Sequence, residues 1–335
     1  MNVDLSTRYL GLTLRNPLIA SACPLNQDPE FLVALEEAGA AAAVFPSLFE
    51  EQIEFQQQQI FGLYEYGTES FAESLSYFPE LEDYNVGPTE YLRRLRAARA
   101  AVRIPLIGSL NGMTVGGWIH FAKLIEDAGV DALELNVYFV PTDPRDSSEG
   151  VERRYLDLVA AVRKAIHIPL AIKVGPYFTS FGHFARRIVD AGADGLVIFN
   201  RYIQPDINLE TLDFFPNLAL SESYESRLSM TWIAMLRGRV GAYLAATGGI
   251  HEVADLIKML LVGADAAMLA SAIYRHGPGH FTQLEQGLRD WLVEKDYTSV
   301  QQMKGSLSRE NCTSPETFER VNYMRSLVAF SGRPI

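Results

Sequence analysis

The sequence is short of cysteine, histidine and basic residues, and each shortage excludes a class of protein. Two cysteines, Cys23 and Cys312, cannot form a disulfide framework. The six histidines lack the spacing of metal ligands, so we expect no metal site. Lysine and arginine number 29 against 41 acidic residues, which gives a net charge of −12. Such a surface repels nucleic acid and anionic membranes, so we expect neither as a partner.

Long apolar runs are missing as well. No run is long enough to cross a bilayer. The first residues, MNVDLSTRYLGL, lack the basic and apolar regions of a signal peptide. These absences predict a cytoplasmic protein. We expect its partner to be a small molecule. The oligomeric state stays open, and a homodimer is possible. The apolar fraction itself is large, 48% of 335 residues, which is enough for the core of one large domain.

An apolar run followed by an amphipathic segment recurs eight times along the chain. Three boundaries between these units share alanine and glycine, at 38–39, 128–129 and 191–192, and Val262-Gly263 is close to this form. Repeated strand–helix units with short connections specify a parallel sheet, and eight of them close a barrel. The sequence therefore predicts one α/β domain over 1–335, a (β/α)8 TIM barrel with its core at about 16–296.

The expected strands and helices follow from the apolar period of each segment. The strands are 18–22, 41–47, 105–110, 131–137, 169–175, 195–200, 242–246 and 266–270. The main helices are 28–38, 88–101, 114–128, 151–166, 179–191, 229–240, a segment ended by Gly263, and 277–295. An N-terminal hairpin over 4–14 should close the bottom of the barrel, and residues 201–228 are expected to be irregular.

Two segments exceed the ordinary barrel. Residues 48–87 form an insertion rich in glutamine, glutamate and aromatic residues, and long loops in compact domains are usually functional. We expect the insertion either to cover the mouth of the barrel or to make an oligomer contact. Residues 297–335 form a C-terminal tail with one more helix expected at 315–329.

The stretch 241–274 carries the strongest functional signal. It contains the last two strands, and each ends in a loop of small residues, Gly248-Gly249 and Ala270-Ser271. Small residues let backbone N–H groups approach a phosphate closely, and barrels often bind phosphate after strands 7 and 8. The alternative is that the glycines only form a tight turn. We favour phosphate because two successive loops agree.

Polar residues at the carboxyl ends of strands line the active site of such a barrel. Those ends supply Ser21, Ser47, Asn111, Asn136, Lys173 and Asn200. Lys173 interrupts an apolar strand, and burying an unpaired ammonium is costly. It is a candidate Schiff-base nucleophile or a cation facing a bound anionic ring, and the structural alternative is an ion pair with Glu134. The amides of Asn136 and Asn200 suit a planar amide or imide ligand.

The order and spacing of these pieces resemble the dihydroorotate dehydrogenase family over residues 3 to about 305. The matching segments are NPLIAS at 16–21, ELN at 134–136, IKVGPYF at 172–178, TGGI at 247–250 and ASA at 270–272. The soluble class 1 enzymes are the closer group, because the membrane-binding N-terminal helices of class 2 are absent. The resemblance does not extend to the tail beyond 305.

The resemblance implies a bound FMN and assigns roles to the candidate residues. The phosphate would lie on Gly248, Gly249, Ala270 and Ser271. Lys173 would face the pyrimidine edge of the flavin and stabilise its reduced anion. Asn136 and Asn200 would hold the substrate ring over the flavin. The further cofactor contacts expected from the family are Ser21, Ala22, Ser47, Asn111 and Asn136.

The chain departs from the family on the substrate side. The family's catalytic cysteine or serine, three residues after the asparagine of strand 4, corresponds here to Phe139, which cannot remove a proton. Pro46 replaces a lysine that touches flavin and substrate, and the substrate loop has no counterpart in 73–87. The glycine pair before helix 6 is also missing. Cys23 could be a substitute base, but a small buried thiol is the favoured interpretation.

We therefore expect an FMN-dependent oxidoreductase acting on CH–CH groups. The family converts dihydroorotate to orotate in pyrimidine biosynthesis, and the change at Phe139 predicts a different small cyclic substrate and poor oxidation of dihydroorotate. No catalytic residue is assigned. The alternatives are a flavin-free barrel lyase that uses Lys173 as a Schiff base, and a non-catalytic flavin-binding partner in electron transfer.

Overall fold

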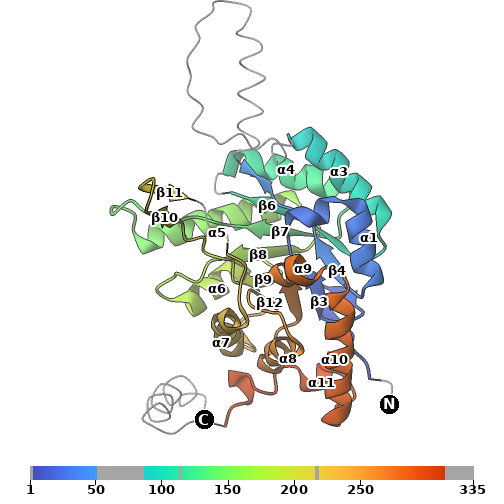
Figure 1. Cartoon of the computed structure of the whole chain (residues 1–335). Coiled ribbons are helices and arrows are strands. Elements are labelled where there is room, and N and C mark those ends of the chain that lie inside the picture. Colours follow the sequence, from blue (N-terminus) through green and yellow to red (C-terminus); the bar gives the residue numbers. More distant parts are fainter. Residues whose placement is uncertain (1–2, 51–86, 113–114, 216–218, 314–335) are drawn as a thin grey trace, which may run out of the picture.

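The computed structural model describes residues 3–50, 87–112, 115–215 and 219–313. Within them, eight parallel strands close a barrel in the order β3–β4–β6–β7–β8–β9–β12–β13, and β13 pairs back with β3. Helices surround this barrel (Figure 1). The strands are β3 (Leu18–Ala20), β4 (Ala42–Val44), β6 (Leu106–Asn111), β7 (Ala132–Asn136), β8 (Leu170–Val174), β9 (Gly195–Ile198), β12 (Tyr243–Thr247) and β13 (Ala266–Leu269). The predicted (β/α)8 barrel is confirmed.

The helices begin and end where local chemistry favours it. The side chain of Asp28 accepts a hydrogen bond from Glu30 N at the start of α1, and Gly263 ends α8 with φ +111°. The helices are α1 (Pro29–Glu37), α3 (Pro88–Ala101), α4 (Val115–Asp127), α5 (Ser148–Ala165), α6 (Phe181–Asp190), α7 (Ser226–Leu236), α8 (Val253–Val262), α9 (Ser271–His276), α10 (His280–Glu294) and α11 (Val300–Met303).

The predicted hairpin closes the bottom of the barrel. Strands β1 (Thr7–Tyr9) and β2 (Leu12–Leu14) pair antiparallel, and Tyr9, Leu10 and Leu14 are buried against side chains that point into the barrel. Leu10 approaches Gly195 so closely that a Cβ at Gly195 would lie 2.6 Å from its Cδ2. The glycine at the start of β9 therefore makes room for the side chain of Leu10. Because the hairpin covers this end of the barrel, we expect a ligand to bind at the opposite end.

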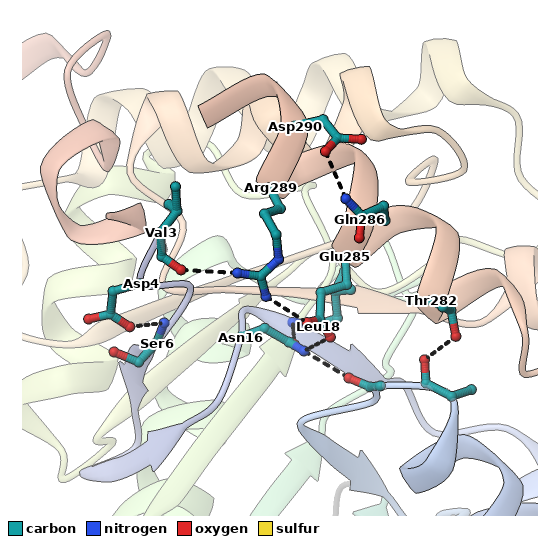
Figure 2. Close-up of polar contacts among 12 residues, drawn as sticks. Val3, Asp4, Ser6, Asn16, Leu18, Thr282, Glu285, Gln286, Arg289 and Asp290 are labelled. Carbon is teal, nitrogen blue, oxygen red and sulfur yellow. Dashed lines mark hydrogen bonds and ion pairs between the residues drawn. The ribbon is translucent and has the colours of Figure 1, made fainter. Parts of the chain in front are cut away.

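A polar clamp joins the last barrel helix to the first strand (Figure 2). The amide of Asn16 donates to Gly39 O at 2.8 Å and to Glu285 Oε2 at 2.9 Å, while its carbonyl oxygen accepts from Leu18 N. Arg289 on α10 donates to Glu285 and to Val3 O, both at 3.1 Å. The asparagine that opens the NPLIAS segment is thus a structural residue.

The structure contains two short helices, α9 and α11, that were not expected, and it differs from the expected elements in two further places. Strands β10 (Asp206–Asn208) and β11 (Asp213–Phe215) form an antiparallel hairpin inside the stretch expected to be irregular. The helix expected at 229–240 is α7, which begins earlier, after the short turn η2 (Ser223–Glu225), and ends at Leu236. The backbone leaves helical geometry at Arg237, with φ −54° and ψ 129°, and the guanidinium of this residue donates to Gly263 O and Asp265 Oδ1.

The described part of the tail packs onto the barrel. Gly305 N and Leu307 N donate to Leu260 O and Leu261 O of α8, each at 2.9 Å. The side chain of Lys304 is 4% exposed, and its Nζ lies 2.7 Å from Asp265 Oδ1. The helix expected at 315–329 and nearly all of the insertion at 48–87, apart from the short strand β5 (Leu48–Phe49), lie outside the described residues. None of the described helices is long and apolar enough to cross a membrane.

Candidate functional site

A cavity of about 430 Å³ opens over the carboxyl ends of β3, β8, β9, β12 and β13. Most of the candidate residues line it: Ser21, Ala22, Lys173, Asn200, Gly248, Gly249, Ala270 and Ser271. Three other candidates, Ser47, Asn111 and Asn136, are not among its lining residues. The hydroxyl of Ser47 lies 2.7 Å from that of Ser109. The barrel thus brings together the residues at one side of its mouth.

The two small-residue loops lie side by side at this cavity. Gly248 and Gly249 both have positive φ, +86° and +70°. A Cβ at Gly248 would meet nothing within 4 Å, whereas one at Gly249 would lie 2.5 Å from Ser226 N. Gly248 therefore faces open space, and Gly249 is fixed beneath the start of α7. This arrangement leaves an open backbone surface at the place expected for a phosphate.

Ser221 joins the two loops and was not found from the sequence. Its hydroxyl accepts from Gly249 N at 3.3 Å, and its backbone N donates to Ser271 Oγ at 3.1 Å. The ring of His251 is 3.3 Å away from the same hydroxyl, and burial lowers the pKa of this histidine. Ser221 precedes η2 within the segment expected to be irregular, where no periodic pattern marks it. Ser221 therefore links the two loops by hydrogen bonds, and the imidazole of His251 lies against its hydroxyl.

Lys173 takes part in a buried ion pair and still borders the cavity. Its Nζ lies 3.4 Å from Glu134 Oε1 and 3.4 Å from Ser21 Oγ. Lys173 is 7% exposed and Glu134 is fully buried. The other oxygen of Glu134 has no hydrogen-bond partner among the described residues. The ion pair suggested as the structural alternative is present, and an ammonium held this way has no free lone pair for nucleophilic attack.

The two candidate amides contact each other. Asn136 ends β7 and Asn200 follows β9, and Asn200 Nδ2 donates to Asn136 Oδ1 at 2.8 Å. Among the described residues this is their one side-chain hydrogen bond. It leaves the carbonyl oxygen of Asn200 and the NH₂ group of Asn136 as one acceptor and one donor for a ligand.

No base stands at the position that the family resemblance identified. Phe139 is half-buried, and the guanidinium of Arg154 lies over its ring, 5.5 Å from the centroid. The hydroxyl of neighbouring Tyr138 accepts from Ile203 N at 3.3 Å. Burial raises the pKa of Tyr155, which packs nearby, to about 12. These side chains offer apolar surface, and the raised pKa of Tyr155 keeps its phenol protonated near neutral pH.

Cys23 lines the cavity as a protonated thiol. Burial raises its pKa to about 11, and the thiol donates to Asn26 Oδ1 at 3.4 Å. A thiol in this state is a poor base at neutral pH, which supports the interpretation of Cys23 as a small buried side chain. No group of three or more His, Cys, Asp and Glu residues that could hold a metal ion occurs in the described part of the chain.

Comparison with known proteins supports the family resemblance. The family model described as dihydroorotate dehydrogenase matches residues 81–292. The catalytic subunit of dihydroorotate dehydrogenase B (NAD(+)) from Thermoplasma volcanium is 25% identical over 310 residues, covering 90% of this chain and 98% of that protein. The putative dihydroorotate dehydrogenase A (fumarate) from Aeropyrum pernix is 25% identical over 315 residues, with 91% and 98% covered.

Proposed function

We propose that this chain, which belongs to the dihydroorotate dehydrogenase family, is an FMN-dependent oxidoreductase acting on a small cyclic substrate other than dihydroorotate. The observation that carries the proposal is that the two small-residue loops and Lys173 line the same cavity. The loops offer an open backbone surface at Gly248, and Lys173 offers a buried ammonium group in the same cavity. A molecule with a phosphate at one end and an anionic ring at the other fits this distribution of charge.

The residues present would divide the work. Gly248, Gly249, Ala270 and Ser271 would hold the FMN phosphate, and Lys173 would lie beside the flavin ring. When bound, FMN supplies the acceptor for the electrons and hydrogen removed from the substrate. The Asn136–Asn200 pair would orient the substrate through its free donor and acceptor. Lys173, held by Glu134, would stabilise negative charge at the ring.

The protein's own side chains limit the reaction. Oxidation of a CH–CH bond releases a proton, and a positioned base typically contributes about 10²–10⁴-fold in rate. Phe139 provides no base, and the raised pKa values of Cys23 and Tyr155 keep both groups protonated near neutral pH. A substrate whose proton is acidic, or leaves directly to water, fits this site better than dihydroorotate.

The first test is the visible spectrum of the purified protein together with two variants of one position. Ala270→Asp places a carboxylate in the cavity, and Ala270→Asn places a neutral group of the same shape there. We expect a flavin spectrum in the wild type, its loss in Ala270→Asp and its retention in Ala270→Asn. A wild type that neither carries nor takes up FMN would refute the proposal. Gly249→Asp is less useful, because its Cβ would clash with Ser226 N.

The second test is anaerobic mixing with dihydroorotate. We expect little or no bleaching of the flavin in the wild type, and little recovery in Phe139→Cys, because Pro46 also removes the family's lysine. Fast bleaching in the wild type would restore dihydroorotate as the substrate.

Two other functions make distinct predictions. A lyase using Lys173 would give a borohydride-trapped adduct with a carbonyl substrate, an outcome that the ion pair with Glu134 disfavours. An electron-transfer partner would hold a reducible flavin without turning over any small substrate.

A further inference from the structure

The loops after β7 and β8 enclose a second cavity, of about 380 Å³. Aromatic rings form much of its wall: Phe139 from the first loop, Phe178 from the second, and Tyr155 from α5. These walls are packed without a ligand, since the rings of Tyr155 and Phe178 meet edge to face at 5.4 Å. Every described lining residue is uncharged. The cavity is thus a preformed apolar pocket.

This apolar cavity adjoins the cavity of about 430 Å³ in which we place the cofactor, called the cofactor cavity below. Tyr177, Asn200 and Tyr202 line both of them. Tyr177 is 70% exposed, and its ring meets that of Tyr202 edge to face at 5.3 Å. Two tyrosine rings and the amide of Asn200 therefore form the wall between the cavities. A ligand in the apolar cavity can extend into the cofactor cavity beside Asn200.

The electrostatics of the apolar cavity oppose an anionic ligand. A carboxylate moved into it would lose its hydration without meeting a cation in the described lining, and such burial is costly. The guanidinium of Arg154 lies over Phe139 and 2.7 Å from Asp146 Oδ1, but Arg154 is not among the residues that line the cavity. The net charge of −12 adds long-range repulsion.

A polar edge completes the apolar cavity. Asn200 lines both cavities, and its hydrogen bond to Asn136, which lines neither, leaves the carbonyl oxygen of Asn200 as an acceptor. A substrate whose ring lies between the aromatic walls can place an N–H group against this oxygen. Buried polar groups of a binding site select ligands that satisfy them, because unpaired groups are costly.

We propose that the apolar cavity binds the aromatic or aliphatic ring of an uncharged substrate, with an N–H group of that substrate donating to the carbonyl oxygen of Asn200. This inference rests on the proposed function and specifies its substrate class. It explains why the change to Phe139 is accompanied by aromatic neighbours: together these residues form a binding surface in place of a base. Carboxylates such as dihydroorotate are excluded.

The test uses two probes of nearly the same shape, neutral 2-naphthamide and anionic 2-naphthoate, titrated into the full-length protein by calorimetry. We expect the amide to bind at least tenfold more tightly than the carboxylate. Phe139→Arg should reverse this preference by supplying a cation. Tyr177→Ser should weaken amide binding at least tenfold, whereas Tyr224→Ser should not change it. Tyr224 is a matched control, because it is 69% exposed and lines neither cavity.

Equal affinities for the two probes, or a preference that neither Phe139→Arg nor Tyr177→Ser alters, would overturn the inference. Tyr177 is exposed, so its variant remains informative even if Phe139→Arg does not fold. The flavin spectrum of the same sample separates the two proposals. A preference for the amide in a protein that never binds FMN would support the apolar cavity and reject the proposed function. A flavoprotein without that preference would do the reverse.

Discussion

Removing Lys173 should expose the buried charge of Glu134. In Lys173→Met the methionine fills much of the same space, but a fully buried carboxylate loses its cation and already has one oxygen without a partner among the described residues. Breaking a buried pair by deleting one member typically costs about 3–5 kcal/mol, more than replacing both members together. We therefore expect Lys173→Met to lower the free energy of unfolding by about 3 kcal/mol.

The double variant Lys173→Met/Glu134→Gln removes both charges at once. It should unfold within about 1 kcal/mol of the wild type, because no uncompensated charge remains. Urea titrations of the flavin-free proteins, followed by tryptophan fluorescence, give the comparison. Lys295→Met is the control, since its lysine pairs with Glu294 at the surface, and its urea midpoint should not move.

The cycle also separates stability from cofactor binding. The double variant should remain folded. We nevertheless expect its affinity for FMN, or the reduction potential of the bound flavin, to be lower than in the wild type, because the proposed cation beside the ring is gone. A Lys173→Met protein as stable as the wild type would refute the ion-pair argument. A double variant with unchanged affinity and potential would show that Lys173 does not contact the flavin.

Three further predictions concern the frame around the site. Asn16→Ala breaks the clamp in Figure 2 and should lower the free energy of unfolding by about 2 kcal/mol in urea titrations, while exposed Gln286→Ala leaves it unchanged. Lys304→Met should cost about 2 kcal/mol in the same assay, because the amine has a charged partner and is buried. Iodoacetamide at pH 8 should label Cys312 well before Cys23 by mass spectrometry, because burial raises the pKa of Cys23 to about 11; equal labelling rates would contradict that shift.

The order of strands and helices could be predicted because each unit repeats the same physical pattern. Buried parallel strands appear as short apolar runs, and helix ends carry a cap or a glycine. The hairpin of β10 and β11 could not be predicted this way. Leu209 and Leu212 are 82% and 79% exposed, so its apolar residues do not mark a buried face. Local hydrogen bonds, such as Glu210 N to Asn208 Oδ1, shape its turn instead.

Only those site residues whose positions follow from the barrel topology could be predicted. Strand ends must meet at the mouth, and Ser21, Lys173 and Asn200 do. Ser221 could not be found, because its contact with Gly249 spans 28 residues and depends on the path of an irregular segment. The assignment of residues to FMN, the extents of the barrel core and tail, the homodimer and the cytoplasmic location stay predictions.

Binding through the backbone and binding through side chains place different demands on the sequence, which is why we propose that the cofactor site is kept here and the substrate site is changed. A phosphate loop depends on positive φ and on the absence of a Cβ, conditions that Gly248 and Gly249 meet whatever their neighbours are. A substrate pocket depends on the chemistry of a few side chains, so one change, such as a base position becoming Phe139, alters what it can bind and which proton it can move. A family match at about a quarter identity therefore supports the cofactor more strongly than the substrate.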